Sequence, residues 1–384
     1  MNKYNYIFAG AGLSSLMTVY EMIQSGLFLH QKILLIDADC KKTNDRTWSF
    51  WEKKYGEWDD IVSHKYETAF FKNKNFNRKL DLQPYHYKTV CGIDFYTKVF
   101  DAIRQNPNIE FLNASIHKVE EYNEGVQVIT NIGNFHAEKV FNSIYNPTIV
   151  ASQTQFPLVQ QHFIGWFIQT TEAVFTPETA TFMDFSVNQK GNTRFMYVLP
   201  TSETEALIEY TLFSPILLKK EEYETEIENY IQGLGISTYQ IIEKEAGNIP
   251  MTCYPFWKHN TKNILHIGSA GGWTKASTGF TFKNTIQKSK AVVRFVQTQS
   301  DFRKFHKKDK FWWYDLLLID ILFYRNEIGS SIFSAMFKKS KAALIYKFLD
   351  EETTFWEDLK VIWQCPKRPF LKAVFCRIFA NKSL

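Results

Sequence analysis

The sequence predicts an α/β fold in which a parallel βαβ unit is followed by an antiparallel β-sheet and a helical C-terminal region. Three observations predict it. Residues 4–37 read as a strand, a glycine turn, a helix and a second strand. From residue 160 onward, several apolar runs are separated by turns, which is typical of antiparallel strands. Residues 301–384 show helical patterns rich in basic and aromatic side chains.

Composition limits the classes of protein to which the chain can belong. With 384 residues and 45% hydrophobic side chains, it can bury a large core and is long enough for two or three domains or subdomains. A mean hydropathy of −0.27, without an uncharged stretch of about eighteen residues, predicts no membrane-spanning helix. The chain enters its first strand at once, so we expect no secretion signal. Five cysteines without a C-x-x-C pair predict scattered thiols in a reducing compartment and no metal site.

Charge is concentrated near the end of the chain. Residues 286–384 carry 19 Lys and Arg against 10 Asp and Glu, a net charge of +9, whereas the preceding residues have a net charge of −4. Aromatic side chains make up 16% of the chain. This content suits a large apolar cavity or interface, although plain core packing would also account for it.

The first forty residues contain a strand, a turn with Gly10 and Gly12, a helix, and a second strand that ends at Asp37. Gly10 permits a tight turn, and Gly12 lets the backbone approach a pyrophosphate at the helix N-terminus. Asp37 lies at the spacing from which a carboxylate can accept hydrogen bonds from a ribose 2′-OH. The third glycine of the motif is missing, because Ser15 stands where Gly or Ala usually allows close packing of the helix. The pattern predicts a Rossmann-like dinucleotide site at these residues, and the alternative is an ordinary glycine-rich turn.

Residues 44–52 mix charges and aromatic side chains too closely for one amphipathic period, and we expect a loop there. In a dinucleotide-binding protein, the loop after the second strand can lie beside the cofactor. Arg46 is therefore predicted to contact phosphates or a flavin ring. The alternative is a surface loop anchored by Trp48 and Trp51.

Residues 60–112 are expected to interrupt and then continue the nucleotide-binding half. Strand-like runs lie within residues 60–90, among them 66–71, and residues 93–105 show a helical pattern. Residues 109–112 are expected to form a third parallel strand. Hairpins then extend to about residue 143. A parallel unit interrupted by a β-meander is common in proteins that hold FAD in an extended form.

The antiparallel region contains two acids in apolar surroundings. Its strands are expected at 162–169, 181–185, 194–199 and 206–211. Because side chains alternate along a strand, Glu209 shares a face with Leu207 and Thr211. Such an acid is either a paired structural charge or a carboxyl kept neutral by desolvation for acid chemistry. Asp184 has the same two interpretations.

A second glycine turn follows late in the chain. After a charged helical stretch near 217–234, an apolar strand at 263–267 leads into Gly268, Gly271 and Gly272. The backbone N–H groups of this turn are predicted to approach the flavin or its ribityl and phosphate groups. Two glycine turns that each follow an apolar strand are more specific together than either is alone.

The C-terminal region suits a surface role. Cationic and aromatic side chains mixed as in residues 301–384 are typical of a segment that contacts a membrane with anionic lipid. The alternative is an amphipathic helical cap on the fold. Nucleic acid is not expected as a partner, because no nucleic-acid-binding module accompanies the charge.

Taken together, the motifs of this chain resemble lycopene β-cyclases of the bacterial carotenoid type, over almost its whole length. The motifs are the turn at 10–12 and residues 45–51, 85–87, 194–200, 207–211, 249–251 and 267–272. The acidic strand motif of that family has the form I-E-x-T and matches residues 208–211. The resemblance thereby makes Glu209 the candidate catalytic acid, with Asp184 as the next carboxyl. The chain departs from related flavoproteins at Ser15, at residues 142–143 and at Ser269.

The resemblance implies an isomerase (an intramolecular lyase) that uses FAD in its reduced form, with NADPH as reductant. It would convert the linear ψ-ends of lycopene and related acyclic carotenoids into β-rings, giving γ-carotene and then β-carotene. It implies a cytoplasmic location, peripheral to the inner face of the cell membrane. The predicted FAD contacts are Gly10, Gly12, Asp37, Arg46, Gly268, Gly271 and Gly272.

The implied chemistry requires no net redox change. A proton adds to the terminal double bond, the carbocation closes onto a neighbouring double bond, and another proton leaves. A neutral carboxyl in an apolar site is a suitable donor, and a reduced flavin and aromatic faces can stabilise the cation. Two alternatives stay open: a flavin-dependent hydroxylase or desaturase of an isoprenoid, and an isoprenoid-binding carrier without catalysis.

The chain is predicted to divide into three regions. Residues 1–60, 91–150 and 245–300 form a discontinuous FAD-binding domain, and residues 61–90 and 151–244 form a substrate-binding β-sheet domain. Residues 301–384 form a helical, basic, membrane-facing region.

Overall fold

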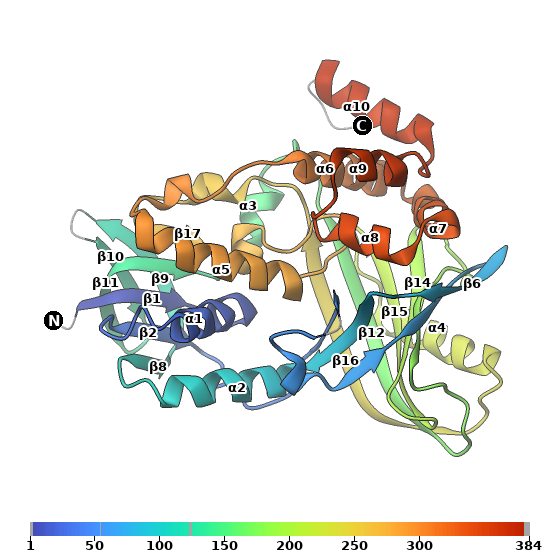
Figure 1. Cartoon of the computed structure of the whole chain (residues 1–384), viewed down its shortest axis with the longest axis horizontal. Helices are drawn as coiled ribbons and strands as arrows, with labels where there is room; N and C mark the ends of the chain where they lie inside the picture. The colour runs from blue at the N-terminus through green and yellow to red at the C-terminus, as the bar shows by residue number, and fades with distance from the viewer. Residues whose placement is uncertain (1–2, 54, 123–124, 380–384) are drawn as a thin grey trace.

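The computed structural model describes residues 3–53, 55–122 and 125–379. Its strands form two seven-stranded sheets and one three-stranded sheet, with a group of helices at the C-terminal end (Figure 1). The predicted α/β fold class is confirmed: a Rossmann-like part, a largely antiparallel sheet and a helical C-terminal region are all present. All five cysteines are free thiols.

The first seven-stranded sheet contains the predicted βαβ unit. Its order is β8-β2-β1-β11-β10-β9, and β17 pairs with β11. The neighbours from β8 to β11, and the pair β11–β17, are parallel, whereas β9, β10 and β11 form an antiparallel meander. The strands are β1 (Lys3–Ala9), β2 (Ile33–Asp37), β8 (Ile109–Asn113), β9 (Ile116–Tyr122), β10 (Gly125–Thr130), β11 (Gly133–Asn142) and β17 (Ile264–His266).

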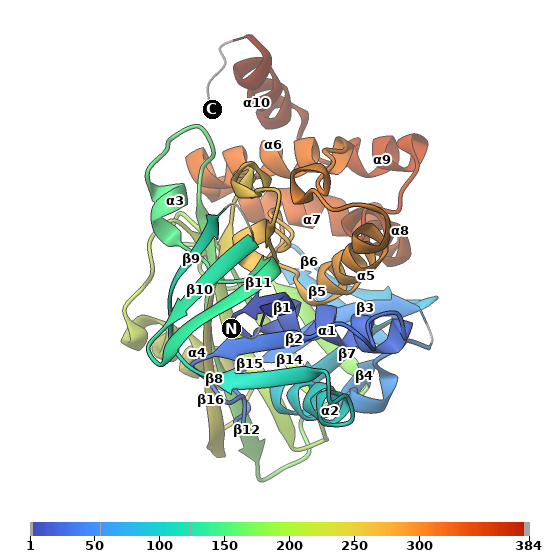
Figure 2. The same ribbon diagram turned by 90° about the vertical axis from the view of Figure 1, so that its left-hand side faces the viewer.

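Three helices pack on one face of this sheet. They are α1 (Leu13–Ser25), α2 (Gly92–Arg104) and α5 (Phe282–Thr298). Leu16, Val99 and Val292, one from each helix, belong to the same buried cluster as Phe8 and Leu35 of the strands. Burial of these apolar side chains stabilises the packing of the helices on the sheet by about 25 cal/mol for each Å² of apolar surface removed from water. Figure 2 shows α1 and α5 side by side, above β2 and beside β1.

The second seven-stranded sheet is the largely antiparallel one. Its order is β16-β12-β15-β14-β13-β5-β6, and all neighbours are antiparallel except β13 and β5. The helix α4 (Lys220–Gly233) covers one face. The strands are β5 (Thr68–Asn73), β6 (Phe76–Asp81), β12 (Val159–Thr170), β13 (Thr179–Asp184), β14 (Thr193–Pro200), β15 (Glu205–Ser214) and β16 (Tyr239–Met251).

Two features cross the predicted domain boundaries. β16 continues through residues 245–251, so the boundary drawn at 244/245 falls inside a strand of the second sheet. The three-stranded sheet has the order β3-β7-β4 and joins chain segments that we assigned to different domains. Its strands are β3 (Thr47–Lys53), β4 (His64–Tyr66) and β7 (Tyr85–Cys91).

The loop predicted at residues 44–52 is wrong over most of its length, because Thr47–Lys53 form strand β3 paired with β7. Adjacent side chains of this strand are buried on opposite sides. Phe50 stacks on Phe282 at a ring distance of 4.7 Å, and Trp51 stacks on Tyr346 at 4.8 Å. A strand covered on both faces shows no alternation of apolar and polar residues, and for that reason the sequence pattern did not reveal it.

The C-terminal helices lie along one end of the molecule, and α10 projects furthest (Figures 1 and 2). Several of their buried residues share a cluster with the second sheet, on the face opposite α4. Among the described helices, none combines the length and apolarity needed to cross a bilayer. The remaining helices are α3 (Pro147–Ala151), α6 (Lys310–Tyr324), α7 (Gly329–Lys339), α8 (Ala342–Leu349), α9 (Phe355–Ile362) and α10 (Lys367–Phe379).

Candidate active site

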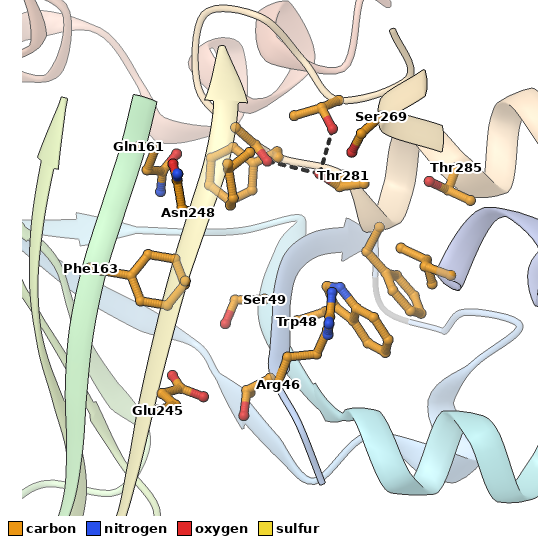
Figure 3. A pocket seen from close by; sticks show the side chains of 18 of the residues that line it. Arg46, Trp48, Ser49, Gln161, Phe163, Glu245, Asn248, Ser269, Thr281 and Thr285 are labelled. Atoms are coloured by element: carbon orange, nitrogen blue, oxygen red, sulfur yellow. Dashed lines mark hydrogen bonds between the residues drawn. The ribbon is translucent and has the colours of Figure 1, made fainter. Parts of the chain in front are cut away.

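A cavity of about 530 Å³, here called the central cavity, lies where the two large sheets meet. Its walls come from the start of α1, from β3, from β12, β14, β15 and β16, and from residues 268–285. Figure 3 shows Arg46, Trp48 and Ser49 on one side, facing Phe163 and Glu245 on the other. Side chains from distant parts of the chain therefore line one cavity.

The helix α1 begins at the central cavity with an open N-terminus. Gly12 is its N-cap residue, no side chain caps the helix, and its first turn contains no acidic residue. A Cβ atom placed on Gly12 would meet nothing within 4 Å. The first N–H groups of a helix have no partner within the helix, and they carry the positive end of its dipole. This arrangement can bind a phosphate.

Gly10 and Asp37 shape this turn and do not line the cavity. Gly10 has a φ of +91°, and a Cβ atom there would lie 2.4 Å from Ser143 Oγ. Asp37 Oδ2 accepts a hydrogen bond of 2.6 Å from the backbone N–H of Ala11, and Oδ1 accepts one of 2.8 Å from that of Asp39. Of the three residues predicted from this motif, the structure brings only Gly12 to the cavity wall.

Arg46 lies on the cavity wall as predicted for a cofactor contact, just before β3. Its Nη2 donates a hydrogen bond of 2.7 Å to Asp45 Oδ2, and Nε donates to the same oxygen at 3.0 Å. Asp45 Oδ1 accepts a further hydrogen bond of 2.9 Å from the Tyr96 hydroxyl. The guanidinium is thus oriented by Asp45, while 56% of its side chain remains accessible.

In the second glycine turn, too, only some of the predicted residues lie at the cavity. Gly268, with a φ of +60°, and Ser269 line the cavity. Gly271 and Gly272 lie off the wall, and their N–H groups bond to the carbonyls of Ile267 (3.1 Å) and Ser269 (3.3 Å). A Cβ atom on Gly271 would lie 2.2 Å from the carbonyl oxygen of His266. These two glycines therefore serve the shape of the turn, and Gly268 is the one at the cavity.

Glu209 lies on the cavity face of β15 and is only 8% exposed. Thr211 Oγ1 donates a hydrogen bond of 2.5 Å to its Oε1. No Lys, Arg or His among the described residues forms an ion pair with it. Burial raises the pKa of the Glu209 carboxyl well above its usual range, and the nearby Glu245 carboxylate raises it further. Glu209 is thus a buried carboxyl that has no ion-pair partner among the described residues, which favours the second interpretation over a paired structural charge.

Asp184 lies on the other face of the same sheet, away from the central cavity. Its Oδ2 accepts a hydrogen bond of 2.9 Å from the hydroxyl of Tyr230 in α4, and its Oδ1 accepts one from the backbone N–H of Ser186. An irregularity in the pairing of β13 with β14, between Thr181 and Asp184, places these two residues opposite Val198 and Met196. The structure therefore does not bring the two candidate acids together.

Three polar residues of the cavity were missed by sequence reasoning. Glu245 belongs to β16, which was not expected as a strand. Its pKa is also raised, first by burial. Gln161 Oε1 and Thr285 Oγ1 are buried at the cavity and have no hydrogen-bond partner among the described residues. The places of Glu245, Gln161 and Thr285 in the cavity depend on the packing of strands and helices that are far apart in the sequence. The only local signal that could have found one of them is the alternation of Glu245 with Gly247 and Ile249, which is typical of a strand.

Comparison with known proteins gives one family. A family model described as "Lycopene cyclase protein" matches residues 5–375. No curated protein has a significant sequence match.

Solved structures resemble the fold over nearly its full length. A geranylgeranyl bacteriochlorophyll reductase-like protein from Thermoplasma acidophilum has a TM-score of 0.61 at 12% identity, covering 97% of this chain and 99% of that chain. Halogenase PltM in complex with FAD has a TM-score of 0.61 at 10% identity, with coverages of 97% and 86%. The p-nitrophenol 4-monooxygenase PnpA from Pseudomonas putida has a TM-score of 0.58 at 13% identity, with coverages of 97% and 98%. The chain thus has the fold of FAD-dependent monooxygenases.

Proposed function

The chain belongs to the lycopene cyclase family, and from this premise we propose that it is a lycopene β-cyclase. It converts the linear ψ-ends of lycopene and related acyclic carotenoids to β-rings, giving γ-carotene and then β-carotene without net redox change. One observation carries the proposal: Glu209 is a buried carboxyl without a cationic partner that faces an aromatic-lined cavity. Such a carboxyl is neutral near pH 7 and has a proton to donate.

The surroundings of Glu209 suit a carbocation. Phe163, Tyr87 and Tyr197 line the same cavity. Their ring faces attract a positive charge, and their bulk excludes water that would add to the cation. Thr211 orients the carboxyl. The chain's own residues thus provide the proton, orient the carboxyl that donates it, and surround the reacting end of the substrate with aromatic rings.

The cavity also fits FAD, which we propose as the cofactor, with NADPH as its reductant. The open N-terminus of α1, the free space beside Gly12 and the guanidinium of Arg46 suit phosphate groups. The unpartnered Gln161 and Thr285 suit polar atoms of a bound molecule. When bound in reduced form, the flavin supplies negative charge close to the developing carbocation.

We also propose that the protein docks on the inner face of the cell membrane from the cytoplasm, because an acyclic carotenoid dissolves in lipid and not in water. Exposed apolar side chains lie on α9, at the residue that follows it and on α10: Trp356, Trp363, Phe375 and Ile378. Lys367 Nζ lies 3.6 Å from the ring centroid of Trp363. Exposed aromatic side chains with neighbouring cations are typical of a surface that enters the headgroup region of anionic lipid.

The test is product analysis after incubation of lycopene in lipid vesicles with the protein, FAD and NADPH. We expect products of unchanged mass that carry β-rings. The fold resemblance to a monooxygenase makes a flavin-dependent hydroxylase the second candidate, and a desaturase is the related alternative. A product with one added oxygen atom, or with two hydrogens lost, would replace the proposal by one of these. Binding of lycopene without any product would indicate a carrier.

A further inference from the structure

We propose that Glu209 and Glu245 act as one catalytic pair, in which Glu209 gives the first proton to the substrate and Glu245 accepts the last one. This inference rests on the proposed cyclase function. It assigns the group that removes the final proton, and it is carried by the register of three neighbouring strands.

The two carboxyl side chains belong to one row across the second sheet. In this row, Gly165 of β12 is the Cα partner of Glu209 on β15 and also of Glu245 on β16. Neighbouring strands are about 4.8 Å apart, so the two glutamate backbones are separated by about 10 Å. Both side chains line the central cavity, and Figure 3 shows Glu245 on the cavity side of β16.

Gly165 lets the side chains of the neighbouring strands pack closely over β12. A Cβ atom built on Gly165 would lie 2.8 Å from Leu207 Cδ1, 3.2 Å from Glu245 Cγ and 3.4 Å from Glu209 Cβ. The first two separations are shorter than ordinary van der Waals contact, so a larger residue would displace the side chain of Leu207 or of Glu245. The glycine has no positive φ, and the close packing of both glutamates and Leu207 accounts for its presence in this row.

The face of β12 that carries Gly165 also carries a polar group without a partner. Gln161 lies on this face, is 8% exposed, and its Oε1 has no hydrogen-bond partner among the described residues. Phe163 lies between Gln161 and Gly165 on that face. The proposed flavin would supply the polar atom at Gln161, so cofactor and carboxyls belong to one cavity.

Electrostatics favour one proton on the pair. Two carboxylates in one apolar cavity repel each other, so both do not ionise together near neutral pH. Burial raises the pKa of each carboxyl, and the charge of Glu245 adds to the effect on Glu209. Arg46 lies on the opposite wall but is ion-paired with Asp45. Two tyrosines that line the cavity, Tyr87 on β7 and Tyr197 on β14, are the titratable groups facing the pair. Cys91 on β7 and Glu243 on β16 lie outside the cavity, and Glu243 acts on Glu245 only through its charge.

The proton balance closes within the pair. The Glu209 carboxyl proton forms a C–H bond on the terminal double bond, leaving a carbocation. The next double bond supplies the electron pair of the ring bond, and the cation moves into the ring. A ring C–H bond then breaks, its electrons form the ring double bond, and the proton goes to the Glu245 carboxylate. Transfer of that proton from Glu245 to Glu209 restores the starting state, with no oxidant or reductant consumed.

The first experiment compares Glu245→Gln with Glu243→Gln, which removes the same charge from an exposed position of the same strand. We expect the parent to show a bell-shaped pH profile of cyclisation, because it needs one carboxyl protonated and one ionised. Glu245→Gln should lose about a hundredfold in rate, the size expected for a lost general base. Its acid limb should disappear, and its alkaline limb should move to lower pH. Glu243→Gln should keep the parental rate at its optimum and the bell shape, with the acid limb moved only slightly to lower pH because a negative charge near Glu245 is removed.

A second measurement needs no turnover. The infrared band of protonated carboxyls is followed against pH in the flavin-loaded parent, Glu245→Gln and Glu209→Gln. Difference spectra between parent and variants separate the pair from other buried acids with a raised pKa, such as Glu21 and Asp350. The pair should titrate in two coupled steps in the parent and in one step, at lower pH than the parental upper step, in Glu245→Gln. Gly165→Ala should separate the two groups and shift the parental steps toward each other. A folded Glu245→Gln variant with the parental rate, pH profile and titration would overturn the pair. If the parent forms no cyclised product, the proposed function fails, whereas the titration still decides whether the carboxyls share a proton.

Discussion

The hydroxyl of Thr211 donates a hydrogen bond of 2.5 Å to the carboxyl of Glu209, which lies two residues earlier on the same strand. Both side chains are buried on the cavity side of β15. The carboxyl is therefore held in one direction by its own strand, and its second oxygen remains available toward the cavity. The first two predictions concern this arrangement.

Replacing Glu209 tests the acid. Glu209→Gln keeps the size of the side chain and accepts the Thr211 hydrogen bond, but it has no transferable proton. We expect cyclisation to fall by about a hundredfold or more, as is typical when a general acid is lost, while FAD and carotenoid binding persist. Glu209→Asp should retain partial activity at best, because the shorter side chain misplaces the proton. A stable, flavin-loaded Gln variant that cyclises lycopene at the parental rate would remove Glu209 from the mechanism.

Replacing Thr211 tests the orientation of that acid. The Thr211 hydrogen bond stabilises the carboxylate form and so lowers the pKa of Glu209. Thr211→Val should therefore raise this pKa further and move the alkaline limb of the pH–rate profile to higher pH. The rate at its optimum should fall by about tenfold to a hundredfold, because the carboxyl is less well positioned. Thr211→Ser retains the donor and serves as the control, with an alkaline limb at the parental position.

Stability should depend on pH with a definite sign. The folded protein binds a proton at Glu209 over a pH range in which the unfolded chain has already lost it, because burial raises the pKa in the folded state. Stability therefore falls as pH rises from the ordinary carboxyl range to the raised pKa, by about 1.4 kcal/mol for each unit of the shift. Glu209→Gln lacks this loss. Urea unfolding should show the variant as more stable than the parent near pH 8, with the difference vanishing near pH 4.

Replacing Gly12 tests the cofactor site. A Cβ atom at this position projects into open space at the start of α1, and the backbone φ of −76° accepts other residues. Gly12→Val should therefore fold normally but prevent a pyrophosphate from approaching the helix N-terminus. Absorbance spectra of the purified protein measure the flavin content, and circular dichroism checks the fold. Full FAD occupancy in a folded variant would show that the pyrophosphate lies elsewhere.

Binding to liposomes tests the membrane surface. We expect the protein to sediment with anionic vesicles at low salt and to be released as salt is added, since screening weakens charge-dependent docking. Trp363→Ala should weaken binding, because this side chain is 72% exposed on the proposed surface. Ile132→Ala removes a comparably exposed apolar side chain from the β-meander and should bind as the parent does. Protein that remains in the supernatant with anionic vesicles at low salt would contradict the proposal.

The sequence by itself determined the elements whose pattern is local. The strand, glycine turn and helix at the N-terminus were predictable because Gly10 supplies a positive φ and Gly12 leaves space at the helix start. Simple alternation placed Glu209 on the same strand face as Leu207, and the structure agrees because β15 pairs regularly with both of its neighbours. Local periodicity is sufficient where a strand is regular and has one apolar face.

Only the tertiary structure decided which carboxyls line the same cavity. Alternation alone puts Asp184 on the same strand face as Phe182, whose ring contacts Tyr197 of the cavity wall, but the irregular pairing of β13 turns Asp184 toward α4. Glu245 became a neighbour of Glu209 through the register of β16 and β15 on β12. A bulge reverses the face of every residue beyond it, and register between strands depends on pairing over long sequence separations. Neither the bulge nor the register can be recognised from local periodicity. The set of acids that line the cavity therefore depends on how the whole chain folds.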